Sequence, residues 1–524
     1  MKLSSVLVCG ALLSACIGVS AESQSDLIQK SPTQLSLKVM GTYESGLIDE
    51  SAAEIVAYDA RRKRAFVTNA NDQSIDVLSV RNPYYPHKLF SIDLTAYGEP
   101  NSVAVYKGTV AVAVAADEAD VEGQVVFFNT RKGRFLNALQ VGFLPDMLTF
   151  SPDGSKLVVA NEGEPNDDYT IDPVGSVSVI TIDKKIKQLT QDDVATASFE
   201  SFNNAVLDPS IRIFGPNASV AQDLEPEYVA ISADSSTAYV VLQENNGVAV
   251  VDLASANVVD IIGLGTKNYN TVQTAMDASD RDNLVNIQPW PVQGFYMPDS
   301  IAAYEFDGQT FLVTANEGDA RDYDGFSEEE RVDDLVLDST ITDAYPNIQD
   351  DAQLGRLKTT TVNGDTDGDG DVDQIFAYGG RSFSIWNTTT GSIVYDSGSD
   401  FERITASLSS SLFNVDDGRS DDKGPEPEAL TLGEINGQTY AFIGLERTGG
   451  IMVYDITNPY SPIFVEYVNN TKLDGNVDEG TAGDVAPEGL AFVAADKSPI
   501  RKPLLIVANE VSGTTTVYRI DIQQ

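Results

Sequence analysis

The chain repeats one pattern seven times, and this repeat limits the possible fold more than any other feature. Each copy has a small or Pro residue, an acidic or Asn residue, an apolar strand, a turn, a second apolar strand, an Asn-Glu-like pair and a third strand. The copies begin at Ala53, Glu99, Leu144, Glu225, Met297, Glu426 and Ala486. Apolar and polar residues alternate between turns such as Pro152-Asp153-Gly154, which predicts β-strands. Several short strands per repeat predict four-stranded antiparallel blades, and therefore an all-β, seven-bladed β-propeller.

The last copy supplies only three strands, because the chain ends soon after the run TTTVYRIDI. Segment 35–43, with the sequence LSLKVMGTY, precedes the first copy and has no partner of its own. We predict that it pairs with the strand around 514–520, since unpaired sheet edges favour aggregation. This pairing would close the ring, so that residues 35–524 form one domain.

Three stretches are longer than connections between blades require: about 183–224, 264–296 and 317–374. Long loops inside a compact domain are usually functional or disordered. We interpret these three stretches as insertions into the propeller.

The first residues have the layout of an export signal, in which Lys2 precedes an apolar stretch and then small residues. Two processing sites fit: cleavage after Ala21 makes 1–21 a signal peptide, and lipidation of Cys16 makes 1–15 a lipoprotein signal. Both cysteines lie in this leader, so no disulfide is expected beyond it. We expect an exported protein that is periplasmic, anchored to the outer membrane or extracellular, with no transmembrane helix.

The chain is strongly acidic, with 79 Asp and Glu against 34 Lys and Arg, and a formal net charge of −45. Residues 1–21 contain one Lys and no acid, so their removal makes the charge about −46. Nucleic acids and anionic membranes are therefore not expected as partners, and a monomer is expected. Such a charge fits solubility in a salty medium or the binding of cations.

Two acidic positions recur in the repeat and are expected to meet at one mouth of the propeller. Loops that lead into the innermost strands lie on the same face as the loops between strands two and three. The strand-start set is Glu54, Asn101, Asp146, Glu227, Asp299, Glu428 and Glu488. The inter-strand set is Asp72, Glu118, Glu162, Glu244, Glu317, Glu446 and Glu510.

Crowded carboxylates need cations, protons or basic partners, because two of them about 4 Å apart repel by about 4 kcal/mol at an effective dielectric near 20. Arg447, Arg321 and Arg381 are available as neighbours. We predict a ligand or cation mouth formed by Asp146, Glu162, Glu227, Asp299, Glu317, Glu428, Glu446, Glu488 and Glu510. Alternatively, the Pro-acid pairs only start strands and the Asn-Glu pairs only build turns.

The run DTDGDGDVD is the sharpest motif in the chain. It places Asp365, Asp367, Asp369 and Asp373 at positions 1, 3, 5 and 9 of a calcium loop, with Gly370 at the turn. We predict that these four side chains bind Ca²⁺, helped by the backbone carbonyl of Asp371, and that the ion orders the long insertion. Position 12 is Phe376 instead of the Glu of an EF-hand, so flanking EF-hand helices are not expected.

The only histidine is His87, in a Tyr-Pro-His turn, so a Ser-His-Asp triad, a His-ligated zinc site and haem attachment are not expected. Catalysis would have to use carboxylates, Lys, Arg, Tyr and hard cations.

The runs LVVANEGEPNDDY, LVTANEGDARDYDGF, DTDGDGDVDQIFAYGGRSFSIW, GPEPEAL and LLIVANEVSGTT resemble the choice-of-anchor I family over nearly the whole mature chain. The resemblance implies a secreted or surface bacterial propeller, related to a mesenchyme-specific cell-surface glycoprotein. It implies no settled activity, although some relatives are labelled alkaline phosphatases.

Three functions fit these observations. The first is a calcium-stabilised surface or periplasmic module that binds an unknown small molecule, glycan or protein at its acidic mouth. The second is a calcium-dependent phosphoesterase, phytase-like or alkaline-phosphatase-like, which would need clustered carboxylates with Lys or Arg beside them. The third is a structural surface scaffold, because fold alone does not decide function.

Overall fold

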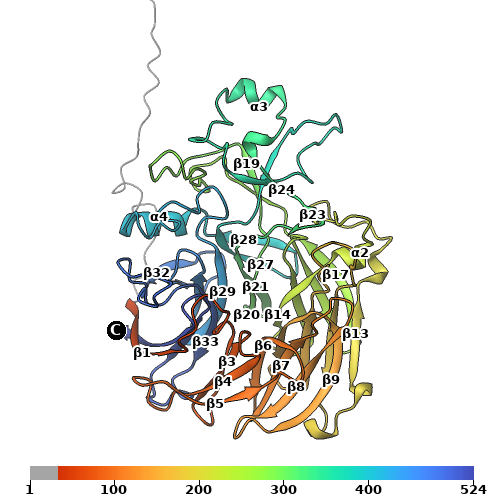
Figure 1. Cartoon of the computed structure of the whole chain (residues 1–524), viewed down its shortest axis with the longest axis vertical. Helices are drawn as coiled ribbons and strands as arrows, with labels where there is room; N and C mark the ends of the chain where they lie inside the picture. The colour runs from red at the N-terminus through yellow and green to blue at the C-terminus, as the bar shows by residue number, and fades with distance from the viewer. Residues whose placement is uncertain (1–33, 524) are drawn as a thin grey trace, which may run out of the picture.

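The computed structural model describes residues 34–523, and these residues form an all-β fold (Figure 1). The predicted leader, with its alternative sites at Cys16 and Ala21, lies outside the described residues. Over 34–523, every helix is too short or too polar to cross a membrane.

The chain forms seven four-stranded antiparallel sheets within the described residues. The first three in chain order are β2 (Val56–Asp59), β3 (Arg64–Asn69), β4 (Ser74–Ser79) and β5 (His87–Asp93); β6 (Glu99–Tyr106), β7 (Thr109–Ala115), β8 (Glu122–Asn129) and β9 (Phe135–Phe143); and β10 (Pro145–Phe150), β11 (Lys156–Asn161), β12 (Ser176–Thr181) and β13 (Val194–Ser198).

The next three sheets are β14 (Pro226–Ile231), β15 (Thr237–Leu242), β16 (Gly247–Asp252) and β17 (Asn257–Gly263); β20 (Ile301–Phe306), β21 (Gln309–Asn316), β27 (Ser382–Asn387) and β28 (Ser392–Asp396); and β29 (Pro427–Ile435), β30 (Gln438–Leu445), β31 (Ile451–Asp455) and β32 (Ile463–Val468). The last contains β33 (Pro487–Val493), β34 (Leu504–Asn509), β35 (Thr514–Gln523) and β1 (Gln34–Glu44).

The first strands of neighbouring sheets contact one another in the order β2, β6, β10, β14, β20, β29 and β33, and β33 also contacts β2. Apolar side chains fill the spaces between the sheets. Val158 and Val177 of one sheet, for example, share a buried cluster with Val229 and Val240 of the next. Burial of these faces supplies the main driving force for the fold.

The predicted pairing of the N-terminal segment with the C-terminal strand is confirmed. β1 runs antiparallel to β35, with Leu35 opposite Ile522 and Leu37 opposite Ile520. Leu35 and Leu37 are 4% and 5% exposed and pack in the core between this sheet and the β29–β32 sheet.

The long connections build a second layer, which lies at the top of Figure 1 around α3 (Ser339–Ala344). It contains β18 (Thr266–Asn268), β19 (Val292–Phe295) and β26 (Ile375–Ala377) in one sheet, and two short pairs, β22 (Asp322–Tyr323) with β23 (Phe326–Ser327) and β24 (Glu329–Arg331) with β25 (Lys358–Thr360). Segments 264–296 and 317–374 share an apolar core, in which Trp290 and Leu354 are buried.

Segment 183–224 differs from this layer, because it includes β13, the fourth strand of the β10–β13 sheet. Only part of that range therefore lies outside the repeated sheets. The remaining helices are short: η2 (Ile186–Gln188), η3 (Gln191–Asp193), η4 (Glu200–Phe202), α2 (Val220–Asp223), η5 (Val332–Asp334) and α4 (Asp400–Leu408).

Candidate functional site

A recurring turn brings the two acidic positions of the repeat together. The residue before the repeat's proline has a left-handed backbone, and its carbonyl accepts a hydrogen bond from the N–H of the inter-strand acid. This bond joins Glu162 to Leu144 at 2.9 Å, Glu446 to Glu426 at 2.8 Å and Glu510 to Ala486 at 2.8 Å, with φ of 41°, 51° and 59° at the three acceptor residues. The pairing register shifts just after the proline in each of these sheets, which places the strand-start acid in a bulge.

Most of the strand-start set lines one cavity of about 200 Å³. Its predicted members there are Glu54, Asn101, Asp146, Asp299, Glu428 and Glu488. Glu99 and Tyr228 also line this acidic cavity. Since the residues come from the first strands of different sheets or from just before them, the cavity lies where those strands meet.

The charges in the acidic cavity are poorly compensated. One carboxylate oxygen of Glu428 and of Glu488 is buried without a hydrogen-bond partner. The predicted mouth residue Glu227, which is not among the lining residues, also has one such oxygen. Burial raises the pKa of Glu428 and Glu488 well above the ordinary value, and neighbouring carboxylates raise it further. Burial likewise raises the pKa of Glu54 to about 8 and that of Asp146 to about 7. Without a cation, these groups therefore hold protons near neutral pH.

The inter-strand set divides into buried and exposed members. Glu244 is 9% exposed, and burial raises its pKa to about 7. Burial also raises the pKa of Glu162 well above the ordinary value, with further contributions from Glu164 and Asp146. Asp72 and Glu118, in contrast, are exposed.

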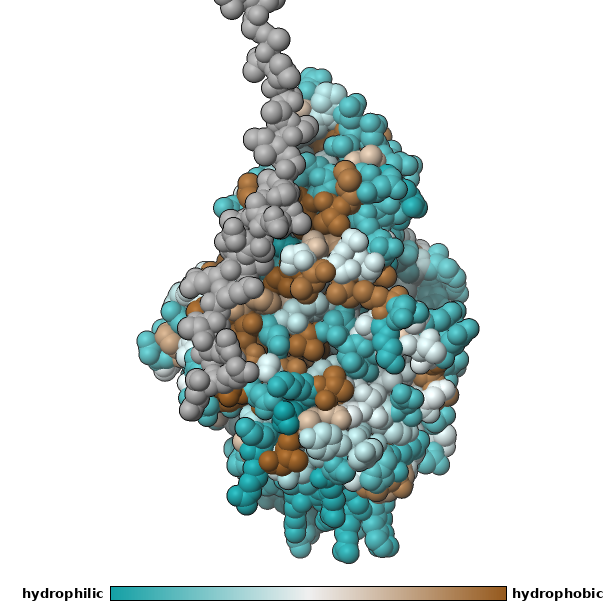
Figure 2. Space-filling model, turned by 90° about the vertical axis from the view of Figure 1, so that its left-hand side faces the viewer, coloured by the Kyte–Doolittle hydropathy of each residue, from teal (hydrophilic) through white to brown (hydrophobic). Residues whose placement is uncertain are grey.

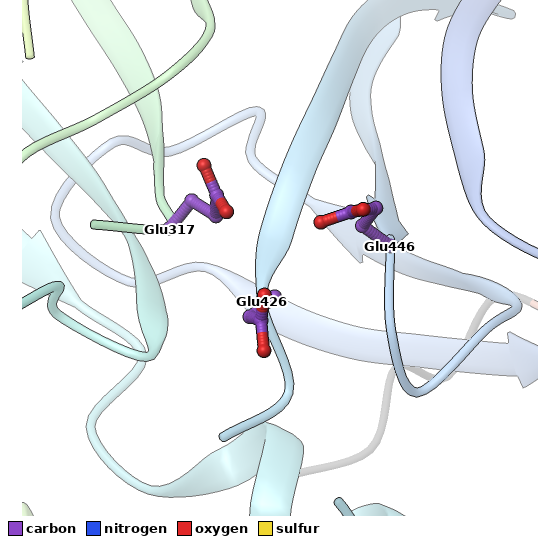
Figure 3. A group of neighbouring side chains, drawn as sticks. All are labelled: Glu317, Glu426 and Glu446. Carbon is purple, nitrogen blue, oxygen red and sulfur yellow. The ribbon is translucent and has the colours of Figure 1, made fainter. Parts of the chain in front are cut away.

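Three glutamates form a second group, the glutamate cluster, which contains Glu317, Glu426 and Glu446. One carboxylate oxygen from each lies within 4.8 Å of the others, and Figure 3 shows the side chains around a common space. Glu426 was not predicted as a site residue. It is fully buried, and one of its oxygens makes no hydrogen bond.

Basic side chains surround the glutamate cluster. Lys423 Nζ lies 2.9 Å from Glu317 Oε1, and Arg419 Nε lies 2.7 Å from Glu426 Oε1. Arg447 Nη2 lies 2.9 Å from Glu446 Oε1. Arg447 is thus a basic neighbour of the acidic residues, as predicted from the sequence. This cluster therefore balances part of its own charge, whereas the acidic cavity does not.

The two other predicted basic neighbours have partners deeper in the protein. Arg321 is 1% exposed and pairs with Asp223 and with Glu225 Oε2, the latter at 2.8 Å. Arg381 is also buried and lies 2.8 Å from Glu402 Oε1. Both arginines thus hold segments of the second layer against the sheets.

The aspartate loop, Asp365 to Asp373, brings three of its five carboxylates together. Oxygens of Asp365, Asp367 and Asp373 lie within 4.8 Å of one another. Asp369 accepts a hydrogen bond from Asp371 N at 3.3 Å, and Asp371 keeps one buried oxygen without a partner. Repulsion from Asp369, followed by burial, raises the pKa of Asp367. The donor set consists of oxygens and so suits calcium.

Sequence reasoning missed Glu426, Glu99, Lys423 and Arg419. The residue at the position of Glu426 is Glu99 or Glu225 in two other copies but Leu144, Met297 or Ala486 in three more, so only part of the repeat carries an acidic signal there. The run Asp416–Asp422 mixes acids with Arg419, but an acidic loop is a weak signal on so acidic a chain.

Comparisons with known proteins point to one family. The chain is 32% identical to Gigasin-3a of Magallana gigas over 192 residues, which cover 33% of this chain and 67% of that protein. It is 27% identical to the mesenchyme-specific cell surface glycoprotein of Strongylocentrotus purpuratus over 256 residues, which cover 40% of this chain but only 32% of that relative. Among solved structures, a chain of Kuenenia stuttgartiensis hydrazine synthase matches with a TM-score of 0.48 at 14% identity, over 91% of this chain and 99% of that one.

The choice-of-anchor I domain model matches residues 54–459, which span most of the chain and include the glutamate cluster, the aspartate loop and all the lining residues of the acidic cavity except Glu488. The expectation drawn from the sequence runs is confirmed: this chain belongs to the choice-of-anchor I domain family.

Proposed function

We propose that the chain is a surface module built as a closed seven-bladed propeller, and that its acidic mouth binds divalent cations, calcium first. Two observations support the closed ring: the contact of β33 with β2 and the pairing of β1 with β35. Family membership and the cell-surface relative support a surface location. Through the cation, the mouth would hold an anionic or polar ligand, such as a small molecule, a glycan or a protein side chain.

The unpartnered oxygens of the acidic cavity carry this proposal. Buried carboxylates normally have hydrogen-bond or ionic partners, because an unpaired buried charge costs several kcal/mol. Glu428 and Glu488 lack a partner at one oxygen each, although they line the same cavity. A divalent cation would replace the protons that their raised pKa values otherwise retain.

Calorimetric titration with calcium tests this site, and the aspartate loop has to be silenced first. In an Asp365→Ala, Asp367→Ala background, we expect residual calcium binding that disappears after Glu428→Gln and Glu488→Gln. The matched control is Glu305→Gln with Glu434→Gln, since both glutamates are exposed. If the cavity variant and the control bind calcium equally well, the acidic mouth is not the cation site.

A calcium-dependent phosphoesterase is the second candidate, and the glutamate cluster favours it. Its three carboxylates lie within metal-bridging reach, with Lys423, Arg419 and Arg447 available for phosphate. Hydrolysis of p-nitrophenyl phosphate with and without calcium tests it. If the protein is a phosphoesterase of this kind, Glu426→Gln should abolish the hydrolysis of p-nitrophenyl phosphate, and Glu434→Gln should leave it unchanged. Absence of calcium-stimulated turnover would remove it.

A further inference from the structure

The acidic mouth lies on one face of the molecule, and the other face carries positive charge on one side. In an antiparallel four-stranded sheet, the turns between strands one and two and between strands three and four lie at the same end. The loops that carry the acidic positions lie at the other end. In Figure 1 the turns of the red, orange and yellow sheets lie along the lower edge, away from α3, and hydrophilic residues cover the lower end of the molecule in Figure 2.

Basic residues crowd the turns of the first two sheets. The β2–β3 turn contains the run Arg61-Arg62-Lys63, the β4–β5 turn contains Arg81, and the β8–β9 turn contains Arg131-Lys132. Hydrogen bonds join them into one surface: Arg81 Nε lies 3.4 Å from the Arg62 carbonyl, and Arg62 Nε lies 3.3 Å from Thr130 Oγ1.

Arg64 extends the same surface and shows how close these like charges are. Its guanidinium donates to the carbonyls of Thr130 and Arg131 at 2.8 and 2.9 Å. Burial lowers the pKa of Arg64, and Arg62 and Arg81 lower it further. The positive charges of Arg62 and Arg81 therefore repel that of Arg64, and an anion bound among them would reduce this repulsion.

The third sheet adds a groove with an apolar floor and a basic rim. The groove has a volume of about 430 Å³; Phe150 and Leu136 contribute to its floor, and its rim includes Lys107, Lys184, Lys185 and Lys187. Tyr106, which also lines it, donates to the Asp153 carbonyl at 2.7 Å and so ties the second sheet to the third.

The last sheet continues the surface on the other side of the first sheet. Lys63 Nζ donates to the Lys497 carbonyl in the β33–β34 connection, which also contains Arg501 and Lys502. Arg501 and Lys502 line a groove with Ile522, the partner of Leu35 in β1. The N-terminal end of β1 therefore lies beside these basic residues.

We call the basic residues of these turns the basic belt. It consists of Arg61, Arg62, Lys63, Arg64, Arg81, Lys107, Arg131, Lys132, Lys184, Lys185, Lys187, Lys497, Arg501 and Lys502. Ion pairs compensate it only in part: Lys184 lies 2.8 Å from Asp193, Lys497 lies 2.8 Å from Asp496, and Arg62 lies 3.8 Å from Asp59. The corresponding turns of the other three sheets contain neither Lys nor Arg: 232–236, 253–256, 307–308, 388–391, 436–437 and 456–462. The basic residues are thus gathered on four adjacent sheets instead of being spread around the face.

We propose that the basic belt docks the protein on a phosphate-bearing membrane surface. Exposed aromatic residues accompany the charges, with Tyr84 at 53%, Tyr85 at 74% and Phe135 at 48% exposure. Aromatic rings beside Lys and Arg suit the boundary between lipid headgroups and water. The position of the N-terminal end of β1 also favours a membrane, because a lipid on Cys16 would be joined to this face through residues 17–33.

The net charge of the chain does not oppose this docking at short range. Charges separated by more than about 8 Å are largely screened at physiological ionic strength. A membrane that contacts the basic belt is therefore attracted by the positive charges of the belt. The acidic mouth lies at the far ends of the same sheets, so its repulsion of the membrane is largely screened. Docking in this orientation would leave the mouth facing away from the membrane.

Vesicle sedimentation with the full-length chain tests the proposal. We expect binding to vesicles of phosphatidylglycerol in phosphatidylcholine, little binding to phosphatidylcholine alone, and release at high salt. Arg61→Ala with Lys132→Ala should weaken partitioning by about 30-fold, because each surface base contributes about fivefold. Neither side chain makes a hydrogen bond among the described contacts. The control pair, Arg281→Ala with Lys472→Ala, removes two exposed bases elsewhere and should bind like the parent.

Several outcomes would overturn the proposal. Binding that a chelator abolishes would assign the contact to calcium at the acidic mouth, since docking through the basic belt needs no metal. An equal loss of vesicle binding in the belt variant and in the control would mean that the binding depends on charge in general and not on the basic belt. Binding to dextran sulfate but not to the vesicles, lost in the belt variant, would make an acidic polysaccharide the partner.

Discussion

A buried carboxylate in this protein can be compensated in three ways: by a base, by a proton or by a cation. Glu317 and Glu446 have bases, Lys423 and Arg447, within 3 Å. Glu428 and Glu488 have no base among the described contacts and keep an unpaired oxygen. This difference separates the glutamate cluster from the acidic cavity and makes the cavity the better candidate for a cation.

Arg321 provides the strongest test of a base that acts only structurally. Arg321→Ala would leave Asp223 and Glu225 buried without their basic partner, so we expect a loss of about 3–5 kcal/mol in the free energy of unfolding. Urea denaturation measures this loss. Arg281→Ala, at an exposed arginine, should change stability by less than about 0.5 kcal/mol. A stable Arg321→Ala protein would contradict the assigned pairing.

The aspartate loop should close on calcium. Asp365→Ala with Asp367→Ala removes two of its three clustered carboxylates, so calcium should no longer protect residues 363–374 from proteolysis. The control is Asp333→Ala with Asp334→Ala, two exposed aspartates of the same insertion. Mass spectrometry of limited digests, with calcium or with a chelator, reads out the difference. Protection that survives in the loop variant would mean that the loop is only a solvated turn.

The sequence predicted that strand-start acids lie together, because Asp146, Glu428 and Glu488 each follow a proline at the same place in the repeat, and these three residues line one cavity. It did not single out Glu426, whose position is acidic in two other copies, Glu99 and Glu225, and apolar in three. It could not predict the bases Lys423 and Arg419, which reach the cluster from a connection outside the repeat. Periodicity shows which residues are equivalent, but contacts from unrepeated loops depend on tertiary packing.

At the scale of elements, β1 was predictable because one strand was missing from the last repeat. Its burial makes it testable. Leu37→Ala should cost about 2–5 kcal/mol, since Leu37 is 5% exposed in the core beside β32. Lys38→Ala, at an exposed neighbour on the other face of the same strand, is the control and should be close to neutral. Equal unfolding midpoints in urea would contradict a stabilising role for β1.

The insertion was harder to predict than the strand. Its apolar residues, such as Trp290 and Leu354, come from two segments that are widely separated in the sequence and join in one core. Neither segment has a periodicity that indicates its partner. This apolar core packs most of the second layer, so we expect calcium to affect the aspartate loop more than the whole of 317–374.

At the scale of the molecule, the raised pKa values make stability depend on pH. Burial raises the pKa of Glu54 and of Glu446 from 4.5 to about 8, so the folded protein binds more protons than the unfolded chain between these values. This contribution to stability is complete below about pH 4.5 and is lost as the pH rises through 8. In a chelator, the melting temperature should therefore fall between pH 5 and pH 8.

Calcium should reduce that fall, because a bound cation compensates the deprotonated carboxylates. Glu428→Gln with Glu488→Gln should also reduce it and make calcium less effective, whereas the Glu305→Gln, Glu434→Gln control should keep the parent profile. Differential scanning calorimetry across this pH range measures both effects. A flat profile in the chelator would show that the buried carboxylates are already compensated.

The total charge of a chain also hides how the charge is arranged. From 34 bases against 79 acids, anionic membranes were not expected as partners. Yet bases occupy the turns of four adjacent sheets, and carboxylates occupy the opposite end of the sheets. Only the assignment of turns to faces reveals this separation, and composition does not contain that information.

The pairing of β1 with β35 has a consequence for how the protein folds during its synthesis. One of the first described strands finds its partner among the last residues of the chain, with Leu35 opposite Ile522. A contact of such sequence separation forms late and slowly, since it requires the intervening chain to be synthesised and brought together. A nascent chain therefore cannot complete its final sheet before residues 514–523 have been synthesised, and until then the edge of β1 has no partner strand.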